Sequence, residues 1–419
     1  MKFIIYNLGC KVNSYESNVM TENLENAGYI LTDKVEDANI AIVNTCSVTN
    51  TADSKSLKTL RQVKKNNPNI ILIACGCLAQ VNSKIIKEKT NADIIIGNIG
   101  KSKIVDLIKN YLRDKNSIED IKDIMHSSFE TMKLNNFDKT RAFVKIQDGC
   151  NNFCSYCIIP YARGQLRSRP KDEVLNEVSA LVNNGYKEIV LTGIHTGKYG
   201  EDFPSYTFSN LLKDILDLKP TIERLRISSI EQGEINDDIL QLLKDKPQIA
   251  NHFHIPLQSG SDSVLKRMNR KYLTDEFYEK LCKIRKIKED VCISTDVIVG
   301  FPGETEEEFN ETYEFIKKCE FAFLHVFPFS ARSGTPAAKM EHQVDPQVKK
   351  ERVHKLLALS AQLQNKYQSK FIGKELDVLF EEYDEKTKTY RGHSSNYIMV
   401  HKKSDTDLTK KLIKVIYEG

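Results

Sequence analysis

The first hundred residues alternate short apolar runs with polar segments that have helical spacing. The apolar runs are KFIIYNL, ANIAIVN, NIILIAC and ADIIIG. Strands that alternate with helices in this way usually form a parallel β-sheet covered by helices. We therefore expect an open parallel sheet with helices over residues 1–115, within an α/β protein. The charged stretch over residues 101–140 is weakly patterned, and we interpret it as a helix followed by a linker.

The alternation resumes with longer units over residues 136–368. Six apolar strands are each followed by a helical pattern, and the strands are AFVKIQ, KEIVLTG, RLRISS, HFHIPL, CISTDVIVGF and FLHVFPF. Six strand–helix units predict a partial (β/α)6 barrel, in which catalytic groups lie on the loops that follow the strands. Residues 369–419 change to β-rich alternation with a glycine turn and no helical period. This pattern predicts a small antiparallel β domain.

The amino-acid composition limits the class of protein and the number of domains. The chain has 419 residues, 40% of them hydrophobic and 28% charged, with a net charge of +4. These values fit a soluble protein of two or three domains, and no apolar run is long enough for a membrane helix. The ten cysteines indicate a reducing cytoplasm, where thiols bind metals or do redox work. The small charge excess only hints at a nucleic-acid partner.

Three cysteines follow three strands of the predicted N-terminal sheet. Cys10 follows KFIIYNLG, Cys46 follows ANIAIVNT, and Cys77 follows NIILIACG. Because ligand crevices lie at the carboxyl ends of parallel strands, these thiols are expected to converge. Cys75 lies inside its apolar run and is assigned to the core. The alternative is that all are buried free cysteines that pack as small hydrophobic residues.

A second cysteine group lies in GCNNFCSYC, after the first barrel strand. Cys150, Cys154 and Cys157 have the spacing C-x3-C-x2-C, and no fourth ligand follows. A structural zinc site normally has four ligands. Three thiolates on one loop instead suit an iron–sulfur cluster in which one iron keeps an open position.

Several motifs resemble those of a known family. AFVKIQDGCNNFCSYCIIPYARGQLRSRP resembles the signature segment of radical S-adenosylmethionine (SAM) enzymes. With LGCKVNSYES, NTCSVTNTADSKS, LTGIHTGKYG, HIPLQSGSDSVLKRMNRKY and TDVIVGFPGETEEEF, the chain is similar to the methylthiotransferases within that superfamily, over nearly its whole length. The C-terminal block resembles their TRAM RNA-binding module, although the chain ends at KKLIKVIYEG, where a further strand is expected.

The resemblance implies a reaction and its cofactors. GCKVNSYES, VTNTADSKS and YCIIPYARG are most similar to the subgroup that methylthiolates C2 of N6-threonylcarbamoyladenosine at position 37 of tRNA, next to the anticodon. It implies two 4Fe-4S clusters, one on Cys150, Cys154 and Cys157 that binds SAM and generates a 5′-deoxyadenosyl radical. The other, on Cys10, Cys46 and Cys77, is implied to carry the sulfur that is methylated and transferred. Such radical chemistry requires a cofactor, because no side-chain acid or base activates this C–H bond.

Further residues are candidates for SAM and substrate binding. Those implied for SAM are Tyr156, which would face the adenine, Thr192 and Gly193, where the backbone would meet the amino group, and Glu231 and Gln258, which could bind the ribose or carboxylate. Packing or solvated-loop roles are the alternatives for these side chains. Arg163 and Arg167 could contact tRNA phosphates or the threonylcarbamoyl carboxylate, because arginine binds both with two hydrogen bonds. We interpret His195, His252 and His254 as wall residues rather than metal ligands.

The implied partners are tRNA, an electron donor of the flavodoxin or ferredoxin type, and a sulfur source, the last two unidentified. We expect a monomer without a membrane segment. Two alternatives are methylthiotransferases acting on isopentenyladenosine tRNA or on an aspartate of a ribosomal protein. A third, from a different class, is a non-catalytic RNA-binding protein with zinc sites.

Overall fold

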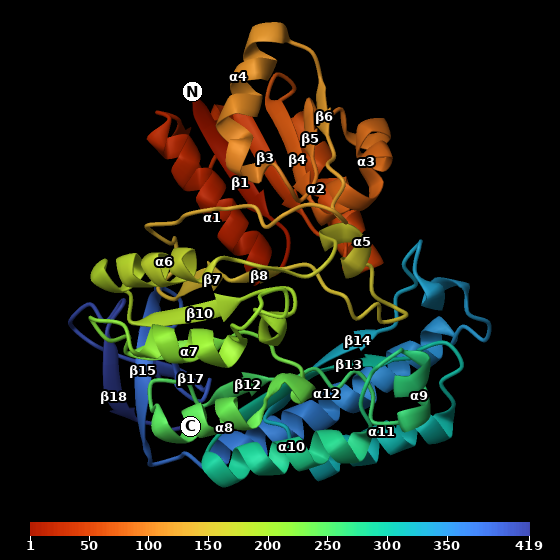
Figure 1. The fold of residues 1–419 in the computed structure, drawn as a ribbon, viewed down its shortest axis with the longest axis vertical. Helices are drawn as coiled ribbons and strands as arrows, with labels where there is room; N and C mark the ends of the chain where they lie inside the picture. Colours follow the sequence, from red (N-terminus) through yellow and green to blue (C-terminus); the bar gives the residue numbers. More distant parts are fainter.

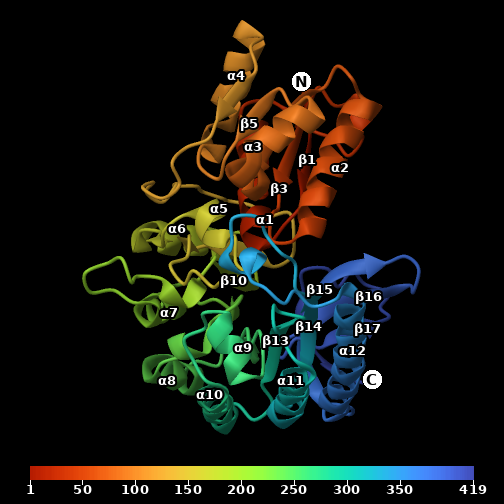
Figure 2. The same cartoon turned by 90° about the vertical axis from the view of Figure 1, so that its right-hand side faces the viewer.

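The computed structural model describes all 419 residues, which form three parts in sequence order. An open sheet stands at the top of Figure 1, a partial barrel lies below it, and a small antiparallel sheet covers one side of the barrel (Figures 1 and 2). The predicted α/β class and all three architectures are confirmed. No helix has both the length and the hydrophobicity required to cross a bilayer.

The N-terminal sheet has six parallel strands in the order β2-β1-β3-β4-β5-β6. Its elements are β1 (Lys2–Asn7), α1 (Lys11–Asn26), β2 (Ile30–Leu31), β3 (Ile40–Thr45), α2 (Asn50–Asn66), β4 (Ile71–Gly76), α3 (Cys77–Thr90), β5 (Ile94–Ile96), α4 (Ile104–Asp114) and β6 (Ile118–Asp120). Helices cover both faces, so β3 and β4 are buried along their whole length. The edge strand β6 lies where the sequence pattern indicated a linker. The pattern did not predict this strand because its IED sequence carries no strand signal.

The barrel consists of two three-stranded parallel sheets, ordered β11-β10-β7 and β12-β13-β14, which a parallel bridge between Leu225 and Ile249 connects. Its strands are β7 (Ala142–Lys145), β10 (Glu188–Thr192), β11 (Arg224–Ile227), β12 (His252–His254), β13 (Cys292–Val299) and β14 (Phe323–Pro328). The covering helices are α6 (Lys171–Asn183), α7 (Phe208–Leu216), α8 (Asp237–Asp245), α9 (Asp262–Arg267), α10 (Thr274–Ile287), α11 (Glu306–Cys319) and α12 (Pro346–Ser369). Apolar residues of these strands and helices share the largest core of the protein.

The C-terminal sheet is antiparallel and lies against the barrel. Its strands are β15 (Glu375–Asp384), β16 (Thr389–Ser394), β17 (Met399–Lys402) and β18 (Leu412–Ile416), in the order β17-β16-β15-β18. Arg224 and Arg226 of β11 reach across the interface, where they donate hydrogen bonds to the carbonyls of Asp377 (2.9 Å) and Ser395 (3.1 Å). The barrel and this sheet are therefore joined by buried polar contacts.

Helix α1 joins the N-terminal sheet to the barrel (Figure 1). Its Glu16 is fully buried and forms ion pairs with Lys101 of its own domain, with Lys145 of β7 (2.8 Å) and with Arg163 (2.5 Å). Burial alone would raise the pKa of Glu16, but the three cations hold it well below its usual value. The carboxylate is therefore charged and binds the two parts together.

Candidate cluster-binding active site

The three N-terminal cysteines lie at the carboxyl ends of adjacent strands. Cys10 precedes α1, Cys46 follows β3, and Cys77 begins α3 directly after β4. Burial, together with the neighbouring thiols of Cys77 and Cys10, raises the pKa of Cys46 to about 11. Burial and Cys77 likewise raise the pKa of Cys10. The three thiols are thus mutual neighbours, as the strand pattern predicts.

The backbone before Cys77 requires glycine. Gly76 has φ +95°, and a Cβ there would lie 2.6 Å from both the Asn44 side chain and the carbonyl of Thr45. Asn13 donates a hydrogen bond to that same carbonyl (3.0 Å), and so ties the start of α1 to the end of β3. Cys75 points into the core on the other side of the turn, as expected.

The second trio lies on the loop between two short strands, β8 (Gln147–Asp148) and β9 (Arg167–Ser168). The loop begins at Gly149, where φ is +75° and a Cβ would come within 1.8 Å of the Gln165 carbonyl. Burial raises the pKa of Cys157 to about 12, and the thiols of Cys154 and Cys150 contribute to the rise. The three thiols therefore lie near enough to influence one another.

Two cationic side chains contact this trio, and sequence reasoning missed both as partners of the thiols. His195 Nδ1 lies 3.5 Å from the Cys150 sulfur, and its other nitrogen faces the Glu234 carboxylate. Burial would lower the pKa of His195, but Cys150 and Glu234 raise it to about 10. Arg270 donates to the Cys154 sulfur (3.5 Å) and pairs with Glu231.

The residues present fit two iron–sulfur clusters. Each trio supplies three thiols without a fourth cysteine or histidine ligand from the same loops, and none of the ten cysteines forms a disulfide. Zinc sites close a tetrahedron, whereas a 4Fe-4S cluster with three thiolates keeps one iron open. Hydrogen bonds to the sulfurs also suit such a cluster, because they tune its potential. Asn98 makes a similar contact to Cys77 (3.6 Å).

Both cysteine loops border one cavity of about 220 Å³. Val48 and Thr49, two and three residues after Cys46, line it together with Tyr156 and Cys157. Its remaining walls come from the inner side of the barrel and the following loops, namely Ile158, Ile159, Gln258, Asp296, Ile298, Phe327, Pro328, Phe329 and Ser330. The predicted residues Tyr156 and Gln258 therefore meet in one mostly apolar space, which the Cys157 thiol and the loop after Cys46 border.

The other predicted SAM-binding residues lie elsewhere around the second trio. Glu231 lines a separate, polar cavity of about 240 Å³ that also contains Cys154, His195 and Arg270. Thr192 ends β10, and a Cβ on Gly193 would lie 2.9 Å from the Gln147 amide oxygen. The structure therefore places Gly193 in close contact with β8, at the base of the cysteine loop.

Arg163 and Arg167 are buried and already have protein partners. Arg163 donates to Glu16 and Asn13 (2.6 Å), and Arg167 donates to the carbonyls of Ile124 (3.1 Å) and Arg163 (2.8 Å). Neither side chain lines the cavity beside Tyr156 and Cys157. The predicted substrate contact is thus replaced by a structural one, because Arg163 holds the loop after Cys157 against α1.

Polar side chains also line the inside of the barrel. His254, Asp296 and His325, from three adjacent strands, place ligand atoms within 4.8 Å of one another. His254 contacts Asp296 (3.1 Å) through one nitrogen and the Ser294 hydroxyl (3.0 Å) through the other. Asp296 also lines the cavity beside Tyr156, so this group of side chains borders that cavity.

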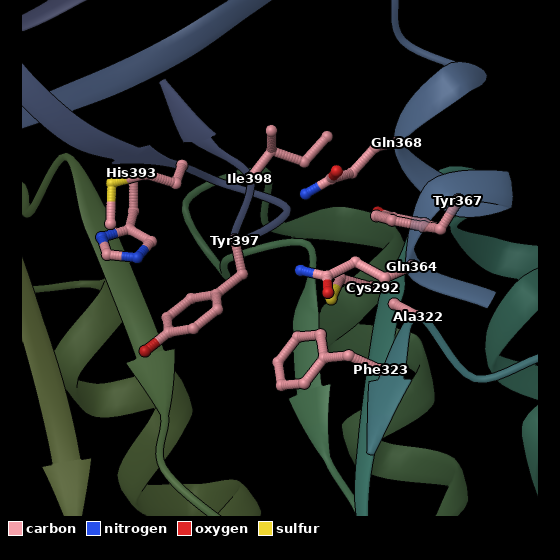
Figure 3. Close-up of a pocket in the computed structure, with 10 residues that line it drawn as sticks. Cys292, Ala322, Phe323, Gln364, Tyr367, Gln368, His393, Tyr397 and Ile398 are labelled. Carbon is pink, nitrogen blue, oxygen red and sulfur yellow. The ribbon is translucent and has the colours of Figure 1, made fainter. Parts of the chain in front are cut away.

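A tyrosine of the C-terminal domain enters this interior. Tyr397, between β16 and β17, has φ +63°, and its ring stacks on His252 (4.4 Å between centroids) and on His393 (4.7 Å). Figure 3 shows it between His393 and Phe323, beside a cavity of about 170 Å³. Arg226 lies over the same ring, 5.1 Å from its centroid.

Comparisons with known proteins agree with this arrangement. Residues 144–316 match the radical SAM superfamily, and residues 2–97 match the uncharacterized protein family UPF0004. The chain is 45% identical over 98% of its length to "Threonylcarbamoyladenosine tRNA methylthiotransferase MtaB" of Bacillus subtilis, covering 92% of that protein. It is 35% identical over 99% of its length to "tRNA-2-methylthio-N(6)-dimethylallyladenosine synthase" of Acetivibrio thermocellus, covering 88% of it.

Solved structures extend the likeness to the fold. The radical SAM methyltransferase TsrM of Kitasatospora setae, solved with cobalamin and a 4Fe-4S cluster, superposes with a TM-score of 0.59. The match covers 80% of this chain and 76% of TsrM at 13% identity, so it concerns the fold alone. Together with the two cysteine trios and the MtaB relative, these findings show that the chain belongs to the methylthiotransferase family of radical SAM enzymes, in its MtaB group.

Proposed function

We propose that the chain methylthiolates C2 of N6-threonylcarbamoyladenosine at position 37 of tRNA, with two 4Fe-4S clusters and SAM as radical source and methyl donor. The observation that carries the proposal is the single cavity bordered by the loops of both cysteine trios. Radical formation and sulfur transfer must meet at one carbon of the substrate. Such a shared space is what a two-cluster transfer requires.

Each trio holds one cluster in this proposal. Cys150, Cys154 and Cys157 hold the cluster that supplies the electron for reductive cleavage of SAM, and Cys10, Cys46 and Cys77 hold the one associated with the transferred sulfur. Tyr156 and Gln258 flank the space between them and orient the nucleoside part of SAM. The mostly apolar walls limit water there, which protects a reactive species from side reactions.

The polar residues around the second trio have supporting tasks. His195 and Arg270 donate hydrogen bonds to cluster thiolates, and their carboxylate partners Glu234 and Glu231 fix their orientation. The amino and carboxylate groups of SAM are assigned to the backbone around Thr192 and Gly193 and to the polar cavity that Glu231 lines. Glu231 already pairs with Arg270, so the carboxylate of SAM is assigned to the guanidinium.

The nucleoside assignment rests on the relatives. Several proteins at 35 to 45% identity are named for threonylcarbamoyladenosine, among them those of Bacillus subtilis and Aquifex aeolicus. Proteins named for dimethylallyladenosine (the isopentenyl nucleoside) reach 35 to 37% identity, so that tRNA is the second candidate. We assign tRNA capture in the cytoplasm to the C-terminal domain, through phosphate contacts that position without reading sequence.

Metal content tests the two-cluster part of the proposal. Anaerobically reconstituted protein should hold about eight irons per chain, because each 4Fe-4S cluster contributes four. Zinc without iron would contradict the proposal and favour a non-catalytic RNA-binding protein. An iron content of about four per chain would indicate a single 4Fe-4S cluster, and would contradict the second cluster proposed for sulfur transfer.

A further inference from the structure

Three polar side chains of the inner barrel wall have no assigned task in the proposed function. His254 of β12, Asp296 of β13 and His325 of β14 each place one ligand atom within 4.8 Å of the others. Asp296 lies directly opposite His325 in the register of the parallel strands β13 and β14. Bulky apolar residues dominate the inner positions of a β/α barrel, so a group of two imidazoles and a carboxylate favours a ligand-binding role.

The side chain of His325 faces the interior of the barrel. Residues two apart on a strand share a face. Phe327, two residues after His325, lines the cavity beside Tyr156, whereas Leu324 and Val326 of the other face pack in the core. His325 is nevertheless exposed, although it lies in the middle of β14. Solvent, or a ligand that replaces it, therefore reaches this imidazole from inside the barrel.

The group has hydrogen-bonding capacity that the chain leaves free. His254 is held at both ring nitrogens, by Asp296 (3.1 Å) and by the Ser294 hydroxyl (3.0 Å). The ring of His325 contacts those of His254 and Phe323, at 5.6 and 5.4 Å between centroids, and neither of its nitrogens has a hydrogen-bond partner in the chain. A neutral imidazole has one donor and one acceptor. His325 can therefore donate to a ligand, and the carboxylate of Asp296 can accept from one.

We propose that His325 donates a hydrogen bond to the carboxylate of the threonylcarbamoyl group, that Asp296 accepts one from the threonyl hydroxyl, and that these contacts select this nucleoside. The inference rests on the proposed function and names the residues that recognise its substrate. Placement supports it, because Asp296 also lines the cavity that the loops of both cysteine trios border, where C2 of the adenine must react. C2 and the N6-bearing C6 flank the same ring nitrogen, so the N6 substituent starts beside the reacting carbon and can reach this wall.

Hydrogen-bonding chemistry supports the same assignment. The substituent carries a carboxylate, which needs a donor, and a hydroxyl, which can donate to a carboxylate. The contact with His254 offsets part of the negative charge of Asp296, and so limits its repulsion of the substrate carboxylate. An isopentenyl group is apolar, and would displace water from His325 and Asp296 without replacing its hydrogen bonds, which is unfavourable.

The test uses anticodon stem-loops with five different substituents on the adenine: none, threonylcarbamoyl, its neutral carboxamide, a valyl analogue in which a methyl replaces the hydroxyl, and isopentenyl. Full-length reconstituted enzyme is compared with His325→Leu, His325→Gln and Asp296→Ala. His354→Leu is the matched control, because His354 is an exposed histidine on α12. Product formation gives kcat/KM, and fluorescence anisotropy without SAM gives the dissociation constant, so recognition is measured even in a variant that cleaves SAM poorly. Iron content and melting temperature verify that each variant folds and holds its clusters.

For the threonyl acid, His325→Leu should lower kcat/KM and affinity roughly 10- to 100-fold, as expected for loss of a hydrogen bond to a charged group. The loss on the carboxamide should be only about 2- to 10-fold, because a neutral hydrogen bond is weaker. His325→Gln keeps a donor and should recover part of the preference for the acid, and His354→Leu should match wild type throughout. Equal losses on acid and carboxamide, or no loss on either, would overturn the role of His325 while the proposed function stands.

Asp296→Ala should weaken binding of the threonyl acid about 2- to 10-fold, as expected for loss of one hydrogen bond, and should not weaken binding of the valyl analogue. Equal effects on the two substrates would overturn the role of Asp296, again without touching the proposed function. If wild type modifies only the isopentenyl stem-loop, the proposed function itself fails.

Discussion

The buried carboxylate of Glu16 offers the sharpest test of how the N-terminal domain is joined to the barrel. It lies between Lys101, Lys145 and Arg163, all at most 2% exposed as whole residues. Glu16→Gln keeps the shape of the side chain and removes the charge, so that Asp148 alone faces Lys145 (2.6 Å) and Arg163 (3.3 Å). Loss of one partner of a buried ion pair costs about 3–5 kcal/mol, because the remaining charges stay buried.

For a unit of the size of the barrel, this cost corresponds to a fall of roughly 6–20 °C in melting temperature. Differential scanning fluorimetry of the purified chain measures it. Glu314→Gln is the matched control, because Glu314 pairs with Lys317 in solvent (2.8 Å) and should change stability by less than about 1 kcal/mol. The double variant Glu16→Gln, Lys101→Met should recover part of the loss, since it removes one uncompensated cation. A single variant as stable as the control, or a double variant no better than the single, would refute this reasoning.

Cys154→Ala should abolish cleavage of SAM to 5′-deoxyadenosine, whereas Cys46→Ala should retain cleavage but form no methylthiolated product. Chromatography measures both products, and the cluster assignment is contradicted if 5′-deoxyadenosine is unchanged in Cys154→Ala or the methylthiolated product is unchanged in Cys46→Ala. Nearby cations outweigh the effect of burial and lower the pKa values of Asp148 and Glu188 to about 2. These lowered pKa values contribute stability above about pH 4.5 that is lost as the pH falls toward 2, so the urea midpoint of unfolding should drop steeply in that range. A urea midpoint that is unchanged between pH 7 and pH 3 would contradict this prediction. Arg332→Gln should lower methylthiolation more than SAM cleavage, because Arg332 holds the loop after Cys46 through its contacts with Ser47 and Asp53. Equal losses of the two activities would contradict this prediction and would indicate a general loss of folded enzyme.

Strand ends and motif spacing were sufficient to predict much of this site. Cys10, Cys46 and Cys77 are far apart in sequence, yet each follows a hydrophobic run, and parallel strands bring their ends together. The six barrel strands were predictable for the same reason. Local pattern could not show which polar side chains serve the site.

The contacts that the sequence pattern did not predict involve residues from distant parts of the chain. Arg270 contacts the sulfur of a cysteine 116 positions earlier, and Tyr397 reaches the barrel interior from another domain. Glu16 has the local pattern of an ordinary surface residue on a polar helix, and only the packing of α1 against β7 buries it. Arg163 shows the reverse case, since an arginine near a cofactor loop suggests a ligand contact but here forms a structural ion pair.

Nucleoside mass spectrometry of tRNA from a strain that lacks this protein, with and without the gene restored, tests the substrate assignment most directly. We predict that the methylthio form of threonylcarbamoyladenosine disappears in the deletion strain, that its unmethylthiolated precursor accumulates, and that the restored gene reverses both. Loss of the methylthio form of isopentenyladenosine instead would contradict the nucleoside assignment. Unchanged tRNA would contradict a tRNA substrate and direct attention to a ribosomal-protein aspartate.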